Sequence, residues 1–190
     1  KSTGNFILPN EIFSGDNKIL RKPFSPSATR FFMLQANYRS ILDFTSTGLE
    51  ASEKGYIKLM EAVSSLANIE PTKTSSIDIK AWKQKCYDAM NDDFNTPVLI
   101  ANLFEAVKYV NLLIEKKATI STEDLLEFKT TISAFVFDVL GIKNEKAASD
   151  STNKLEGVVN MLIEMRNEAR ANKNWALSDE IKDKLAVLDI

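Results

Sequence analysis

The sequence predicts an all-α protein, an antiparallel helical bundle followed by a C-terminal helical hairpin. Six glycines and five prolines among 190 residues leave long uninterrupted segments, which favours helices over a turn-rich β protein. In several segments apolar residues recur at spacings of three and four, the pattern of a helix with one buried face. We expect a leading region at 1–44, the bundle at 45–142, a linker at 143–153 and the hairpin at 154–190.

The leading region holds an expected short helical turn at 7–13, a second expected helix and the basic charge surplus of the chain. Ser25 can cap a helix whose first residue is Pro26. Residues 1–43 carry six basic and three acidic side chains, a surplus of three, so with a net charge of -2 the remainder carries minus five. A contact with a polyanion is therefore expected near the front. Residues after Tyr38 look extended, and Arg39 is expected to pair with Asp43.

Four helices are expected in the bundle, and each follows a residue that can cap it. The first runs from Thr45 to about Asn68, and the second starts at Asp78. The third has Thr96 as its N-cap and Pro97 at its first helical position, where the missing N–H costs nothing. Its apolar stripe marks it as a core helix, and comprises Leu99, Leu103, Val107, Val110, Leu113 and Ile114.

The fourth helix and the aspartates before the third complete the bundle. Ser121 or Thr122 caps the fourth helix, and Gly141 stops it in the C′ position. Asp92 and Asp93 precede the third helix, where carboxylates meet unpaired N–H groups and the positive end of the helix dipole. We interpret this pair as capping residues, with metal binding or acid/base chemistry as the alternative.

The composition excludes several classes of site. Forty-four per cent hydrophobic and 26 per cent charged residues are typical of a soluble globular protein, and no apolar run approaches a membrane span. The chain has no histidine, which excludes a His-based triad and a His metal cluster. Cys86 is the only cysteine, so it cannot form an internal disulfide, and we expect its side chain to pack as a small buried hydrophobic group. A protein without disulfides fits a reducing compartment. The chain starts at Lys1 without a leader, so we expect no signal peptide and a piece of something longer.

The hairpin pairs an expected helix ending near Asn172 with one beginning at Trp175. Arg166, Arg170 and Lys173 fall at i, i+4 and i+7, so they are expected to project from one helical face near the turn. Such a face can contact phosphates and loop bases of RNA. The alternative is an ordinary solvated face, because neighbouring glutamates can pair with the arginines along the helix.

Several of these stretches, taken together and in order, resemble the cysteinyl-tRNA synthetases, a family of class I aminoacyl-tRNA synthetases. Lys-Ser-Thr-Gly-Asn-Phe at residues 1–6 is similar to the end of their Lys-Met-Ser-Lys-Ser loop. The segments 30–34 and 38–44 resemble the region that follows this loop. Residues 90–97 resemble their Asp-Asp-Phe-Asn-Thr-Pro signature, and residues 166–181 their C-terminal helical motif.

This resemblance implies the C-terminal part of an enzyme that joins cysteine to tRNA(Cys) through a cysteinyl-adenylate. Residues 1–44 would then be the end of the catalytic loop and the stem-contact region. Residues 45–142 would be a bundle of the DALR anticodon-binding type, and 154–190 part of the anticodon-recognition region. The resemblance also implies a cytoplasmic, monomeric parent enzyme without a membrane partner.

The resemblance assigns ATP to the catalytic loop, with Lys1 as a catalytic residue and Lys1 and Ser2 as ATP contacts. An ammonium placed where phosphate charge develops stabilises the transition state more than the ground state. The zinc ligands of the family belong to a catalytic domain that these residues do not match, so we expect no metal site and no catalysis in this chain alone. The expected tRNA contacts are Arg30, Arg39, Arg166, Arg170, Lys173 and Trp175.

Two other readings stay open. A related ligase of mycothiol synthesis joins cysteine to an amino sugar and shares the catalytic architecture, although a sugar offers nothing for the arginine-bearing hairpin to bind. A helical interaction module without an RNA role would fit the acidic balance, with a sequence pI of about 5.4. The segment between Asn5 and Arg30 is also longer than the usual family spacing, so its geometry departs from the family pattern.

Overall fold

The computed structural model describes the backbone of residues 7–186 and the side chains of residues 7–145 and 158–185. The chain divides into two compact units, Lys1–Lys143 and Asn144–Ile190. In the described backbone the regular elements are helices, joined by turns and by one isolated bridge between Thr72 and Ser121. The predicted all-α class is confirmed.

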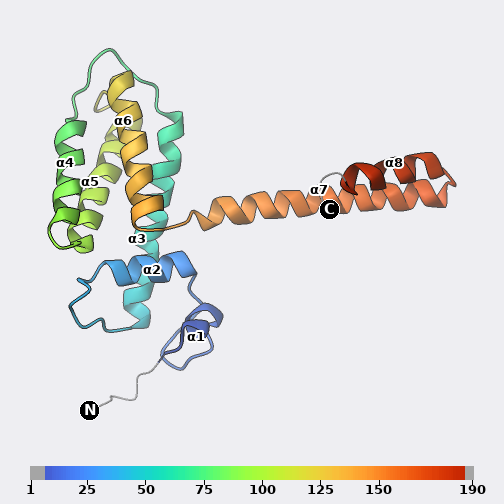
Figure 1. The fold of residues 1–190 in the computed structure, drawn as a ribbon, viewed down its shortest axis with the longest axis horizontal. Helices are drawn as coiled ribbons and strands as arrows, with labels where there is room; N and C mark the ends of the chain where they lie inside the picture. The colour runs from blue at the N-terminus through green and yellow to red at the C-terminus, as the bar shows by residue number, and fades with distance from the viewer. Residues whose placement is uncertain (1–6, 187–190) are drawn as a thin grey trace. The chain divides into compact units, whose positions relative to one another are not determined.

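An antiparallel four-helix bundle makes up most of the first unit. Figure 1 shows its helices running alternately up and down. They are α3 (Ser46–Ser65, extended by the short 3₁₀ turn Leu66–Asn68), α4 (Ile79–Asn91), α5 (Thr96–Ile114) and α6 (Thr122–Ser133). The last helix ends in the π-helical turn η2 (Ala134–Val139), which the periodicity of the sequence did not indicate.

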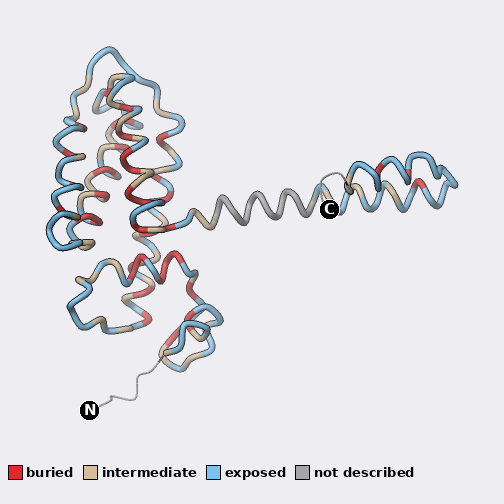
Figure 2. Tube along the Cα trace, in the orientation of Figure 1, coloured by how far each residue is buried: buried red, intermediate tan, exposed pale blue. Residues whose placement is uncertain are grey.

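The core of the bundle lies along the inner faces of these helices. Figure 2 shows buried residues on the sides of the helices that face one another. Among the helices of the described residues, α5 is the one that is long and apolar enough for a membrane span, contrary to the expectation that no run would be. Its stripe of Leu99, Leu103, Ala106 and Val110 is nevertheless fully buried within the bundle, which is the position of a core helix.

The predicted caps explain where most helices of the first unit begin. Each of four side chains accepts a hydrogen bond from the N–H three residues later, which pairs a donor that the helix itself leaves unpaired. These residues are Ser25, Thr45, Asp78 and Ser121. Cys86 is fully buried as predicted, and burial raises the pKa of its thiol to about 12.

The cap of α5 differs from the prediction. Thr96 is the first helical residue, and Asn95 is the N-cap, because its side-chain oxygen accepts the Val98 N–H at 3.4 Å. The Asn95 amide also donates to the Asp92 carboxylate at 2.9 Å, which holds the cap in place. Pro97 is therefore the second helical residue. Asp92 supports the cap through Asn95 instead of accepting a helix N–H itself.

The region before the bundle packs against it. Helix α2 (Pro26–Leu34) contributes Phe31 to the main core and Phe32 to a smaller one. This smaller cluster also takes residues from α1 (Pro9–Ser14) and from the start of α3. The leading region 1–44, which was expected as a part separate from the bundle, therefore belongs to the same compact unit as the bundle.

The second unit is a helical hairpin of α7 (Glu145–Ala171) and α8 (Trp175–Ala186). The boundary between the two units falls at the start of the predicted linker 143–153, and from Glu145 onward this segment is helical as the first part of α7. In the described part of the hairpin, the buried side chains are Ala169, Ser178 and Ile181. The described part of this hairpin therefore has only a small core of its own.

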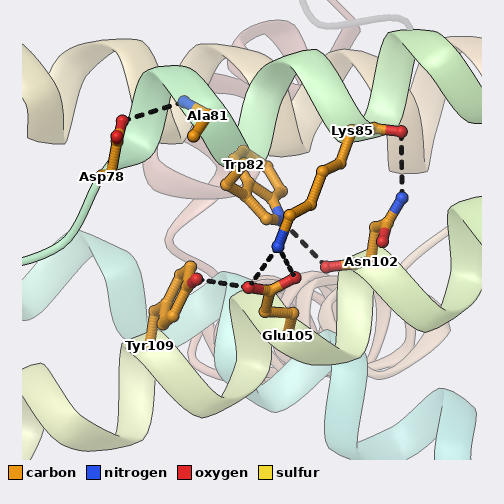
Figure 3. Close-up of polar contacts among 7 residues, drawn as sticks. All are labelled: Asp78, Ala81, Trp82, Lys85, Asn102, Glu105 and Tyr109. Atoms are coloured by element: carbon orange, nitrogen blue, oxygen red, sulfur yellow. Dashed lines mark hydrogen bonds and ion pairs between the residues drawn. The ribbon is translucent and has the colours of Figure 1, made fainter.

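A polar cluster fixes α4 against α5 (Figure 3). The Trp82 indole N–H donates to the Asn102 carbonyl at 2.8 Å, and the Asn102 amide donates to the Lys85 carbonyl at 3.0 Å. The Lys85 ammonium contacts both oxygens of Glu105 at 2.9 and 3.0 Å, and the Tyr109 hydroxyl donates to the same carboxylate. These bonds, with that of Tyr109 first, lower the pKa of Glu105.

We predict an acid-sensitive contribution of Glu105 to stability. Because its pKa is lower in the folded than in the unfolded chain, its stabilisation is complete above the unfolded value and is lost as the pH falls through the folded value. The difference in free energy of unfolding between wild type and Glu105→Gln should therefore shrink from neutral to acidic pH in urea titrations. Glu70→Gln, at an exposed position, is the control. A constant difference for Glu105→Gln would contradict the prediction.

Candidate functional site

The turn between α4 and α5 has an unusual backbone. Asp93 and Phe94 are consecutive non-glycine residues with positive φ, 52° and 54°. Such a conformation costs an ordinary side chain about 1–2 kcal/mol per residue. Backbone bonds hold it, from Phe94 N–H to the Met90 carbonyl at 3.1 Å and from Asn95 N–H to the Ala89 carbonyl at 3.0 Å. The turn leaves the Phe94 side chain 67% exposed.

Asp93 connects this turn to the loop that follows α2. The Tyr38 hydroxyl donates to the Asp93 carboxylate at 3.0 Å, and an Arg39 Nη lies 3.0 Å from the same group. Arg39 Nε donates to the Tyr38 hydroxyl at 2.9 Å, and the guanidinium lies 5.2 Å from the Tyr38 ring centre. Partial desolvation, followed by the Asp93 hydrogen bond, raises the pKa of Tyr38. Arg39 thus pairs with Asp93, and the predicted pair with Asp43 is wrong.

A pocket of about 710 Å³ lies between the two loops. We call it the Tyr38–Phe94 pocket, and the residues that line it are Met33, Leu34, Ala36, Asn37, Tyr38, Ser40, Leu42, Phe94 and Thr96. Its walls are mostly apolar and include Met33, Leu34 and Leu42. Its volume falls within the range of about 300–1,000 Å³ that is usual for small-ligand sites. Arg39 therefore lies beside an open apolar pocket and not on a plain basic surface.

Arg30 has a structural contact. One of its Nη atoms donates to the Gly141 carbonyl at 3.2 Å, which joins α2 to the end of the bundle. The Arg30 side chain is nevertheless exposed, so it lies on the surface with at least one of its N–H groups bonded within the protein. Lys1 and Ser2 lie outside the described residues.

The hairpin presents part of its predicted cationic face. Arg166 is half-buried and Arg170 is exposed, one turn apart on α7. Lys173 does not continue their face, because α7 ends at Ala171 and Lys173 lies in the turn with φ 58°. Trp175 begins α8 and is 57% exposed.

The alternative of glutamate pairs along α7 is not what the structure shows there. Within the described residues 158–185, the ion pair is Glu180 with Lys184 on α8, and Arg170 has none. Arg166 Nε is buried without a hydrogen-bond partner within the described part of the chain. In the described residues no group of three or more Cys, Asp or Glu side chains could hold a metal ion.

Comparisons with known proteins decide the relationship. Residues 85–144, from the second half of α4 to the end of the bundle, match the DALR domain family. A curated protein of Bacteroides fragilis named cysteine--tRNA ligase is 49% identical over 189 residues, 99% of this chain and 38% of that protein. This chain is a relative of the cysteine–tRNA ligases. The resemblance to the cysteinyl-tRNA synthetase family is thereby confirmed.

Other cysteine–tRNA ligases match in the same way. The protein of Porphyromonas gingivalis is 42% identical over 99% of this chain and 39% of its own length. That of Chlorobaculum tepidum is 36% identical over 97% of this chain and 37% of its own length. The chain thus spans less than two fifths of the curated relatives that it matches.

Sequence reasoning missed the Tyr38–Phe94 pocket. It singled out Arg39 by charge and residues 92–97 by capping pattern, but the two segments are joined only in the folded chain. One available signal was the position of Phe94, an aromatic residue among polar turn residues and outside any apolar stripe.

Proposed function

We propose that this chain is the tRNA-holding part of a cysteine–tRNA ligase. The observation that carries the proposal is 49% identity to such a ligase over 99% of the chain. The match to the DALR domain adds support, because it falls on the bundle that the resemblance assigns to anticodon binding. The chain itself would position tRNA, and the ligation of cysteine would need the remainder of the relatives' length.

The charges of the described surface support this role. Arg39 on the first unit and Arg170 and Lys173 on the second are exposed cations, each near an exposed aromatic side chain in sequence. Cations neutralise phosphates, and aromatic rings stack on unpaired bases. ATP and zinc stay expectations of the resemblance, since Lys1 and Ser2 lie outside the described residues.

The direct test is binding of this chain to tRNA(Cys) and to the same tRNA with a changed anticodon, at two salt concentrations. Salt-sensitive binding supports the proposal, since released counterions make phosphate contacts weaken with salt. Discrimination between the two tRNAs would show that the anticodon is read. Absence of binding at low salt would contradict a tRNA-holding role for this chain.

We predict that Arg166→Ala with Arg170→Ala weakens tRNA binding and flattens its salt dependence. Each lost phosphate contact should reduce the slope of log K against log salt by about one. Lys184→Ala is the matched control, a cation of the same unit that is paired with Glu180. Equal effects of the control and the double variant would attribute the change to net charge alone. An unchanged slope in the double variant would remove the hairpin from the tRNA interface.

A further inference from the structure

We propose that the Tyr38–Phe94 pocket binds an unstacked base of RNA, as a contact on the first unit in addition to those of the hairpin. The inference rests on the proposed function, and it deepens it by naming a site and the chemical group that occupies it. Four features of the described structure lead to it: two exposed rings, a guanidinium on one of them, a strained turn and an apolar wall.

The rings form a surface on which a base can stack. Tyr38 is 61% and Phe94 67% exposed, and both line the same pocket from different loops. Two exposed rings that line one pocket form a joint apolar surface, and such a surface indicates a binding site more strongly than a single exposed ring does. Proteins bind unpaired bases by stacking them on Phe, Tyr and Trp rings and on Arg guanidinium planes.

Arg39 adds the group that such a site needs for the nucleotide's phosphate. Its Nε is used by Tyr38 and one Nη by Asp93. The planar guanidinium carries five N–H donors, so others remain for an incoming phosphate. The Asp93 carboxylate beside this contact is paired with Arg39 and accepts a hydrogen bond from the Tyr38 hydroxyl.

A need for the Phe94 ring at the surface would explain the backbone strain of the turn. Two consecutive residues in the left-handed conformation are costly, and Phe is not among the residue types that adopt it readily. The bonds from Asp93 to Tyr38 and Arg39 hold the turn so that Phe94 faces the pocket. Strain of this kind accumulates at binding sites, where the surrounding contacts fix it.

The surroundings favour a base over an apolar peptide. Most residues that line the pocket belong to the front segment, residues 1–43, which carries a basic charge surplus that attracts polyanions. Asn37, Ser40 and Thr96 stand among its apolar walls and offer hydrogen-bonding groups for base edges. An apolar protein segment would leave these polar groups unpaired on burial.

The variant that tests the site is Phe94→Asn. Asn tolerates the left-handed conformation, so the turn is kept while the ring is lost. We expect binding of tRNA(Cys) and of a fluorescent hexa-adenylate to weaken about tenfold, since stacking is worth about 1–3 kcal/mol per base. The salt slope should stay unchanged, because no phosphate contact is removed. Thermal unfolding of the variant, matching wild type, shows that the fold is intact.

Phe13→Asn is the matched control. It removes an exposed phenylalanine of α1 that does not line the pocket, so it should keep the affinity that Phe94→Asn loses. If Phe94→Asn bound both RNAs as tightly as wild type does, the pocket would not be a base-binding site. The proposed function would still stand in that case, provided that wild type binds tRNA in a salt-sensitive way. No binding of either RNA by wild type would overturn both. Self-association of wild type that Phe94→Asn abolishes, with unchanged RNA binding, would assign the pocket to a protein contact instead.

Discussion

Replacing Trp82 by alanine is expected to lower the free energy of unfolding of the first unit by about 4 kcal/mol. The side chain is 1% exposed, and its ring packs edge-on against Phe128 of α6 with centroids 5.0 Å apart. Its N–H also bonds the Asn102 carbonyl of α5, so one residue of α4 contacts two neighbouring helices. The loss combines a cavity with a missing hydrogen bond. Urea unfolding followed by circular dichroism measures it.

Trp82→Phe separates the two parts of this loss. It keeps an aromatic ring in the core and removes the N–H, so it should cost about 1–2 kcal/mol. Trp175→Phe in the hairpin is the second control, because Trp175 is exposed and its replacement should change stability by less than about 0.5 kcal/mol. If Trp82→Ala cost as little as Trp175→Phe, the central position of Trp82 in the core would be refuted.

Local patterns in the sequence were sufficient to predict most helices of the bundle. Ser25, Thr45, Asp78 and Ser121 each precede an apolar stripe, and a capping side chain needs only its own helix to act. The start of α7 was missed for a related reason. The segment after Asn144 has no apolar stripe, yet Glu145 and the alanines at 147 and 148 are good helix formers, so the helix extends there without one.

The candidate site could be predicted only in part, because its contacts join distant segments. Arg39 was identified by its charge, but its partner Asp93 lies 54 residues further along the chain, and a nearer carboxylate was the obvious choice from sequence. The bond between Arg30 and Gly141 joins residues 111 positions apart. No periodicity indicates such pairs, since they depend on how α2 crosses the bundle and on where each loop returns.

The Arg30 contact leads to the second large expected effect, that of Gly141→Ala. Gly141 ends the bundle in the left-handed conformation, with φ 61°, which alone costs an alanine about 1–2 kcal/mol. A Cβ there would also lie 2.3 Å from Nη1 of Arg30, so the guanidinium must leave the Gly141 carbonyl. We expect a total loss of about 2–4 kcal/mol, measured by urea unfolding of the first unit.

A double-mutant cycle with Arg30→Ala separates two causes of this loss, the backbone strain at residue 141 and the collision of the new methyl group with Arg30. Once the guanidinium is absent, the added methyl group has space, so Gly141→Ala should then cost only the conformational part, about 1–2 kcal/mol. Additive effects would show that Arg30 does not approach Gly141. The same Arg30→Ala variant tests the role of this arginine in RNA binding. If its contribution is the bond to Gly141, stability falls while the salt slope of tRNA binding stays unchanged, whereas a phosphate contact would lower the slope by about one.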